Sequence, residues 1–185
     1  MVFQFKIYFF IFAINTAVAL TAAHFLWKRR QTPSAKTLFW LNLAAAEWSL
    51  AVGLEAAAVS PNLKTLFSKI EYIGFNCTAA LLLVFALEYT QKHDWLKPKR
   101  IILYWLIPIT TILLAATNEW HHLIWSGFSN IDSETNLRIY NHGPWFWVNI
   151  ASIYVNTAVA TLLFIQKAFH TSPIYRHQIS SLLIG

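Results

Sequence analysis

Long apolar stretches separated by short charged segments constrain this sequence more than any other feature. Each stretch is about 20 residues long, the length that an α-helix needs to cross a hydrocarbon core of about 30 Å. Only 12% of the 185 residues are charged, whereas a typical soluble domain has about 25%. The chain therefore lacks the charge to cover a soluble surface, and the sequence predicts an all-α, polytopic membrane helix bundle in a lipid bilayer.

Five stretches are long enough for full spans, and a sixth begins near the end of the sequence. The predicted spans are residues 3–27, 37–59, 66–89, 101–117 and 144–169, followed by a partial span at 174–185. A half-span cannot end in hydrocarbon with free carbonyl groups. We therefore expect residues 1–185 to be one transmembrane domain and a fragment that is cut within its sixth span.

The distribution of Lys and Arg predicts the orientation of the bundle. The loops after the first, third and fifth spans hold four, four and two of these residues, and the opposite side holds Lys6, Lys64, Lys69 and Arg138. Cytoplasmic loops of membrane proteins are enriched in Lys and Arg, so we expect the N-terminus outside. Because the charges flank the spans, the net charge of +6 is interpreted as a topology signal, and no nucleic-acid partner is expected.

Three polar residues are predicted at mid-membrane depth. An ionisable side chain inside a span costs at least ~2.5 kcal/mol on insertion scales, so it is a candidate functional residue by default. Glu47 lies near the middle of the second span, and Asn15 and Asn156 lie at similar depth in the first and fifth. We expect these residues to form one polar layer if their helices face each other. The layer is interpreted either as hydrogen-bonded packing or as the relay of a small transporter or proton-conducting protein.

A second polar group is predicted in the outer third of the bundle. Its members have matching depths and are expected to ring a water-accessible cavity that binds a ligand. The predicted ligand-binding residues are Glu55, Glu71, Tyr72, Asn76, His122, Trp125 and Asn149. The alternative is an ion pair between Glu55 and Lys69 near the interface, with side chains that extend toward water.

The connection between the fourth and fifth spans, residues 118–143, is long and polar. Residues 124–128 and 137–140 are apolar or aromatic enough to pair as a short β-hairpin across the polar turn 129–136. Next to the predicted cavity, this connection is expected to form a rigid aromatic lid.

Histidines in the same connection raise the possibility of a metal site. His121, His122 and His142, with Asp132 or Glu134, are residue types that bind zinc, copper or iron. The spacing H-x-x-x-H does not occur, so the sequence favours the lid over a metal site and no cofactor is expected. An intramembrane enzyme or cofactor protein that uses these histidines is a third hypothesis. No phosphate-binding loop, dinucleotide-binding turn or G-x-S-x-G motif occurs.

Several short motifs follow one another along the chain. They are Trp48 with Leu54-Glu55, then Lys69-Ile70-Glu71-Tyr72-Ile73-Gly74, Phe85-Ala86-Leu87-Glu88-Tyr89-Thr90, Thr117-Asn118 with His122-Leu123-Ile124-Trp125, and Tyr175-Arg176-His177-Gln178. In this order they resemble the N-terminal seven-helix membrane region of bacterial sensor histidine kinases. The resemblance covers the whole chain.

The resemblance implies a sensory domain in the bacterial cytoplasmic membrane, with seven spans and an extracytoplasmic N-terminus. It also implies a cytoplasmic output module, a kinase or a diguanylate cyclase, through which the protein forms a homodimer. The chain itself is then expected not to be an enzyme. We expect it to bind an unknown small-molecule or lipid-soluble ligand in the outer half of the bundle and to signal to that output module.

Overall fold

The computed structural model describes residues 2–169, and these are mostly helical, which confirms the all-α prediction. The helices are α1 (Ile7–Lys28), α2 (Ala35–Ala57), α3 (Pro61–Tyr89), the 3-10 helix η1 (His93–Leu96), α4 (Pro98–Ala116), α5 (Asn118–His121) and α6 (Pro144–Phe169). Two short strands, β1 (Trp125–Phe128) and β2 (Tyr140–His142), complete the described part of the chain.

Within the described residues, five helices are long and apolar enough to cross a membrane: α1, α2, α3, α4 and α6. Each matches a predicted full span within a few residues. The largest difference is at α3, which begins at Pro61 because proline suits the first turn of a helix, where its missing N–H is not needed. The predicted partial span at 174–185 lies outside the described residues.

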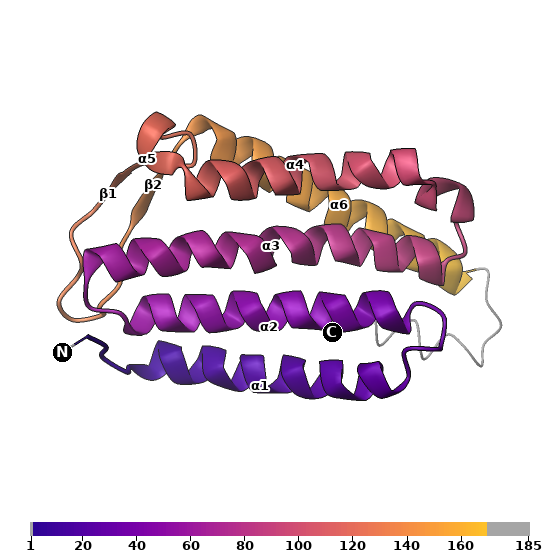
Figure 1. Ribbon diagram of the computed structural model, residues 1–185, viewed down its shortest axis with the longest axis horizontal. Coiled ribbons are helices and arrows are strands. Elements are labelled where there is room, and N and C mark those ends of the chain that lie inside the picture. The colour runs from indigo at the N-terminus through magenta and orange to yellow at the C-terminus, as the bar shows by residue number, and fades with distance from the viewer. Residues whose placement is uncertain (1, 170–185) are drawn as a thin grey trace.

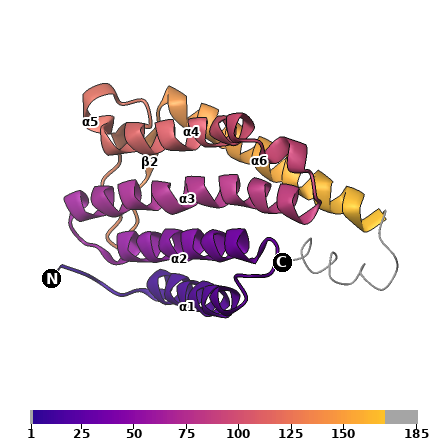
Figure 2. The ribbon, with the colours of Figure 1, turned by 45° about the vertical axis from the view of Figure 1, so that its right-hand side comes forward.

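The helices pack in a simple order. Helix α1 contacts α2, α2 contacts α3, and α3 contacts both α4 and α6. Both ribbon views place α1 and α6 on opposite sides of the α2–α3 pair (Figures 1 and 2). Helix α3 therefore lies at the centre of the bundle and has the largest buried share of the five.

Small residues explain the close contact between α2 and α3. At Gly74, an added Cβ atom would lie 2.5 Å from the carbonyl oxygen of Ala44 and 2.7 Å from the backbone nitrogen of Trp48. Alanines such as Ala46, Ala51 and Ala80 are also buried. Small residues let membrane helices approach closely, since association in lipid depends on van der Waals packing and not on exclusion of water.

Large apolar side chains point away from the bundle. On α1, Ile7, Ile14 and Val18 are each more than 60% exposed, and on α4 Ile102 and Leu103 are equally exposed. A protein in water buries such residues against one another. Their outward orientation is that of a bundle whose surroundings are lipid.

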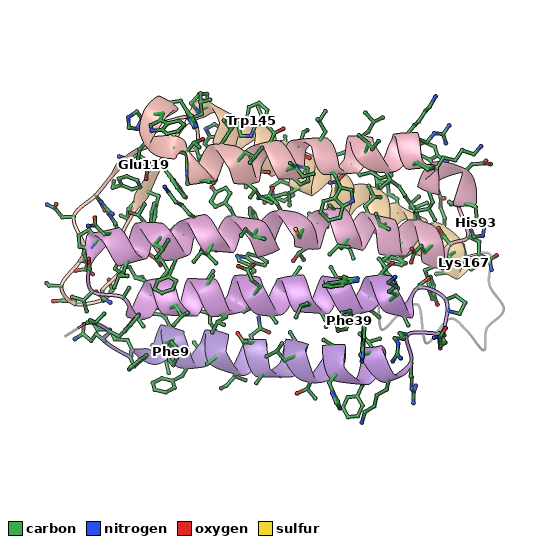
Figure 3. All side chains as sticks on the ribbon, viewed as in Figure 1. Phe9, Phe39, His93, Glu119, Trp145 and Lys167 are labelled. Carbon is green, nitrogen blue, oxygen red and sulfur yellow. The ribbon has the colours of Figure 1, made fainter. Side chains whose placement is uncertain are left out.

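The two ends of the bundle differ. At one end lie the hairpin and α5 with Glu119 and Trp145, and at the other lie His93 and Lys167 (Figure 3).

The predicted hairpin is confirmed: β1 and β2 are antiparallel, with Trp125 opposite His142. The second strand begins at Tyr140 and not at residue 137 as predicted, because a turn closed by hydrogen bonds between Asp132 and both Asn136 and Leu137 takes up the preceding residues.

Candidate functional site

A cavity of about 260 Å³ lies at the hairpin end of the bundle. Helices α2, α3 and α6 form its walls, together with both strands of the hairpin. We call it the outer cavity, and its lining residues are Trp48, Ser68, Glu71, Tyr72, Phe75, Trp125, Tyr140, His142, Phe146 and Ile150.

Aromatic rings make up most of the wall and support one another. The rings of Tyr72 and Trp125 meet edge to face, with centroids 5.3 Å apart, and Trp125 lies 5.8 Å from Tyr140. The rings of Trp48, on α2, and Phe75, on α3, are 5.0 Å apart. Such ring pairs add stability beyond the area they bury. Packed aromatic rings therefore form most of the cavity wall.

A buried asparagine places Trp125 in this wall. The side-chain oxygen of Asn118 accepts hydrogen bonds from the backbone N–H groups of Ile124 and Trp125, at 2.9 and 3.0 Å. Its side-chain nitrogen donates to the carbonyl oxygen of Trp125 at 3.0 Å. These three bonds attach the start of β1 to Asn118 at the start of α5.

Three of the seven predicted ligand-binding residues line the outer cavity: Glu71, Tyr72 and Trp125. A fourth, Glu55, lies directly behind the wall, where its Oε1 accepts a hydrogen bond of 2.8 Å from the Tyr140 hydroxyl. Burial raises the pKa of Tyr140, so this hydroxyl keeps its proton and acts as the donor.

The other three predicted residues do not line the outer cavity, and a ligand-binding role for them stays a prediction. Asn76 and Asn149 are buried within the bundle, where Asn76 donates to the carbonyl oxygen of Tyr72 at 2.8 Å. His122 is exposed at the end of α5, in a left-handed backbone conformation with φ of 55°. These residues were predicted from depth alone, and the direction in which each side chain points keeps it out of the outer cavity.

Sequence reasoning also missed several lining residues. Trp48, Ser68, Phe75, Tyr140, His142, Phe146 and Ile150 were not predicted to be in the site. For Tyr140 and His142 a signal existed, because a hairpin that starts at the predicted wall residue Trp125 must bring its second strand to the same place. Because β2 runs from Tyr140 to His142, whereas the predicted second strand was 137–140, His142 lay outside the prediction.

The alternative ion pair between Glu55 and Lys69 is not formed. Instead, the buried ammonium of Lys64 lies 4.0 Å from Glu55 Oε1 and donates to the carbonyl oxygens of Glu55 and Asn136, at 2.8 and 2.6 Å. Lys69 points toward α5, where it contacts both carboxylate oxygens of Glu119 at 2.6 and 2.8 Å. Lys64 therefore joins the ends of α2 and α3 to the outer connection.

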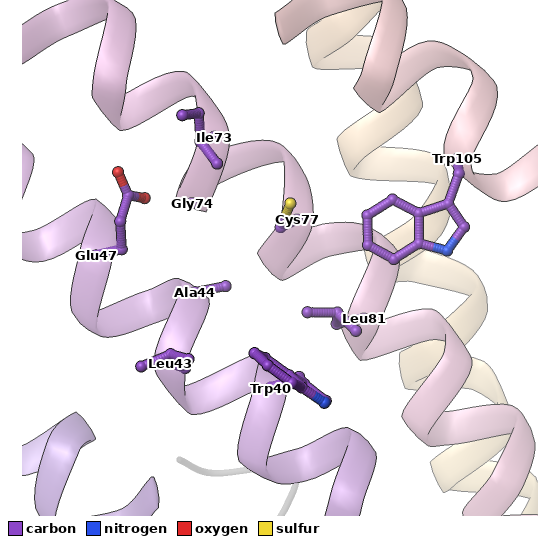
Figure 4. Close-up of a pocket in the computed structure, with 9 residues that line it drawn as sticks. All are labelled: Trp40, Leu43, Ala44, Glu47, Ile73, Gly74, Cys77, Leu81 and Trp105. Carbon is purple, nitrogen blue, oxygen red and sulfur yellow. The ribbon is translucent and has the colours of Figure 1, made fainter.

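A second cavity, of about 390 Å³, lies farther from the hairpin, and Figure 4 shows it. Its lining is nearly all apolar, with Trp40 and Trp105 on its sides and Glu47 and Cys77 near its inner wall. The carboxylate of Glu47 lies against α3, and neither of its oxygens has a hydrogen-bond partner among the described residues.

The predicted mid-membrane layer of Asn15, Glu47 and Asn156 is not formed as one unit. Asn15 donates to the Ser49 hydroxyl at 3.0 Å, in the interface between α1 and α2. Glu47 faces α3 (Figure 4), and Asn156 lies on α6, beyond α3. The order of the helices therefore separates residues that share one depth.

The histidines of the outer connection have separate surroundings. Nδ1 of His121 accepts a hydrogen bond of 3.0 Å from the N–H of Leu123, and its Nε2 lies 3.2 Å from the Thr117 hydroxyl. His142 stacks on Phe146 with ring centroids 3.6 Å apart. Within residues 2–169, no group of three or more His, Cys, Asp or Glu residues is arranged to hold a metal ion.

Comparison with known families gives a match over nearly the whole chain. Residues 9–185 match the family described as the N-terminal 7TM region of histidine kinase. No curated protein and no solved structure matches the chain.

Proposed function

We propose, because this chain belongs to the family of N-terminal seven-transmembrane (7TM) regions of histidine kinases, that it senses a small ligand in its outer cavity. The family is a sensory input domain and carries no catalytic domain, and its members are multi-pass membrane proteins. The proposal adds where the signal binds and how it reaches the cytoplasmic output domain.

The observation that carries the proposal is the outer cavity itself. It is concave, mostly aromatic, and contains a few polar groups, which is the usual character of a ligand site. Residues from three helices and the hairpin meet there, so a bound molecule contacts all of them at once. A ligand that fits one packing of these elements better than another shifts their equilibrium by its differential affinity.

Helix α3 is the proposed connection to the inner end of the bundle. It carries Glu71 and Tyr72 at the cavity and continues to Tyr89 near the opposite end. There, Phe85 and Tyr89 pack against Phe164 of α6, with ring centroids 5.9 and 6.0 Å apart. A movement of α3 relative to α6 at the cavity would therefore alter this inner cluster, from which a dimeric output domain would receive the signal.

The proposed orientation places the hairpin outside the cell. The end of the bundle opposite the hairpin carries Lys28, Arg29, Arg30, Lys92 and Lys97. An excess of Lys and Arg marks the cytoplasmic side of a membrane protein. This arrangement would open the outer cavity toward the extracytoplasmic side of a bacterial inner membrane.

The test is signalling by the full-length receptor in its native membrane. Glu71→Gln and Tyr72→Phe are expected to lower ligand-dependent phosphorylation or reporter output. Glu119→Gln is the control, because Glu119 is an acid at the same end that does not line the cavity. If both cavity variants signal as the unmodified receptor does, the outer cavity is not the sensory site.

A proton-conducting role is the second candidate, and one observation favours it. The buried carboxylate of Glu47 lacks a hydrogen-bond partner within the described residues, and ionisable groups inside a membrane often belong to proton relays. Proton flux into liposomes that disappears in Glu47→Gln would support this role. Flux that is absent from the unmodified protein would exclude it.

A further inference from the structure

We propose that the outer cavity binds a small organic cation, with its ammonium group among the aromatic rings and the Glu71 carboxylate as counterion. This inference rests on the proposed function, because it names the ligand class of the same cavity.

The cations at this end of the bundle are already engaged elsewhere. Lys64 binds Glu55 and two backbone carbonyl groups, and Lys69 binds Glu119. Arg138 donates to the carbonyl oxygen of Ser129 at 3.2 Å and lies over an aromatic ring outside the cavity. Lys6 donates to a backbone carbonyl in the outer connection. Among residues 2–169, no Lys or Arg side chain lines the cavity.

Glu71 is left without a partner. It makes no hydrogen bond or ion pair with any residue in the range 2–169, and its charged neighbours, Glu55 and Glu47, are also acids. A carboxylate in a largely apolar site is unfavourable unless it takes up a proton or an opposite charge compensates it. A ligand that brings a positive charge into the cavity supplies that compensation.

The remaining lining also suits a cation. The faces of aromatic rings carry negative electrostatic potential and attract ammonium groups, and Trp48, Trp125 and Phe146 come from three different sides. The hydroxyl of Tyr140 donates its proton to Glu55. Its oxygen therefore offers lone pairs to a donor inside the cavity.

Size limits the ligand further. A volume of about 260 Å³ is just below the range of about 300–1,000 Å³ for sites of drug-sized ligands. The cavity suits a compact ammonium or quaternary amine better than a peptide or a lipid.

The test compares cations with neutral molecules of the same shape. Binding is measured by isothermal titration calorimetry on the purified chain in a maltoside detergent, because phosphatidylcholine lipids carry a trimethylammonium group of their own. The cationic probes are choline, tetramethylammonium and phenyltrimethylammonium. The neutral probes are neohexanol and tert-butylbenzene, in which carbon replaces the nitrogen of choline and phenyltrimethylammonium.

We expect saturable binding of at least one cation and binding of its neutral counterpart that is weaker by about tenfold or more. Glu71→Gln is expected to lose this preference, Glu71→Asp to keep it, and the control Glu119→Gln to bind as the unmodified protein does. An unchanged melting temperature of Glu71→Gln shows that the variant is folded.

Two results would overturn the inference. One is equal binding of cations and neutral counterparts, which leaves the cavity as a site but removes the role of charge. The other is the absence of saturable binding for all three cations. The proposed function fails independently, if the cavity variants leave signalling of the full-length receptor unchanged.

Discussion

At the scale of single residues, the outer end depends on a lysine that water cannot reach. The ammonium of Lys64 is fully buried, and it bonds the last turn of α2 and the outer connection at the same time. Asn136 completes this link by donating to the carbonyl oxygens of Ala56 and Ala58, at 2.8 and 3.1 Å. The carbonyl groups at the end of α2 are thereby satisfied, as buried backbone groups must be.

Lys64→Met is therefore expected to be strongly destabilising. It keeps the volume of the side chain but leaves Glu55 and buried carbonyl groups without their cation, at a cost of about 3–5 kcal/mol. The control is Lys97→Met, whose ion pair with Asp94 is exposed and worth about 1 kcal/mol or less. Thermal unfolding in detergent measures both, and equal melting temperatures for the two variants would contradict the role assigned to Lys64.

A second prediction at this scale concerns pH. Hydrogen bonds from Lys69 lower the pKa of Glu119, so the pair stabilises the fold above the unfolded pKa of about 4.3. This contribution is lost as the pH falls through the lower pKa of the folded state. Because Glu119 is largely exposed, the contribution is at most about 1 kcal/mol.

The measurement is the difference in melting temperature between the unmodified chain and Glu119→Gln. We expect a small difference at neutral pH that shrinks as the pH falls below the unfolded pKa of about 4.3 and disappears below the lower pKa of the folded state. Glu134→Gln, a change at an exposed acid in the same connection, is the control at both pH values. A difference that persists unchanged at low pH would show that the ion pair is not its source.

At the scale of helices, the contact between α2 and α3 sets the geometry of both cavities. Gly74 lies in this contact, and a Cβ atom there would be 2.1 Å from Glu47 Oε2 and 2.5 Å from the carbonyl oxygen of Ala44. The backbone of α2 cannot move away locally, so α3 would have to shift as a whole. Trp48 and Tyr72, which lie on the two helices, would then separate at the outer cavity.

Gly74→Ala is expected to destabilise the bundle by about 1–3 kcal/mol through overpacking. Gly127→Ala is the matched control, because its Cβ atom would meet only the side chain of Asn141, at 3.5 Å, and is expected to change stability by about 0.5 kcal/mol or less. Thermal unfolding compares the two. A neutral Gly74→Ala would mean that the helices are not in close contact at this position.

At the scale of the whole molecule, the two ends of the bundle are expected on opposite sides of the membrane. After Cys77→Ser removes the native thiol, Ser133→Cys tests the hairpin end and Gln31→Cys the opposite end, since both positions are exposed. A membrane-impermeant maleimide should label the first variant in intact cells and the second only after permeabilisation. The reverse pattern would invert the proposed orientation and place the outer cavity in the cytoplasm.

The five spans within the described residues, their approximate limits and the presence of a hairpin followed from the sequence, because each depends on local information. A bilayer of fixed thickness requires apolar stretches of fixed length, and alternating apolar residues around a polar turn indicate two paired strands. The depths of Glu71, Tyr72 and Glu55 could be predicted from the sequence in the same way, because depth is a count of residues along a helix.

The tertiary structure alone decided which residues of equal depth meet. Depth is one coordinate, whereas contact also depends on the rotation of each helix about its axis and on the order in which helices pack. Rotation directs Lys64 and not Lys69 toward Glu55, and packing order separates Asn15 from Asn156. Both are set by close packing among small residues such as Gly74, over distances in the sequence at which a local pattern carries no information.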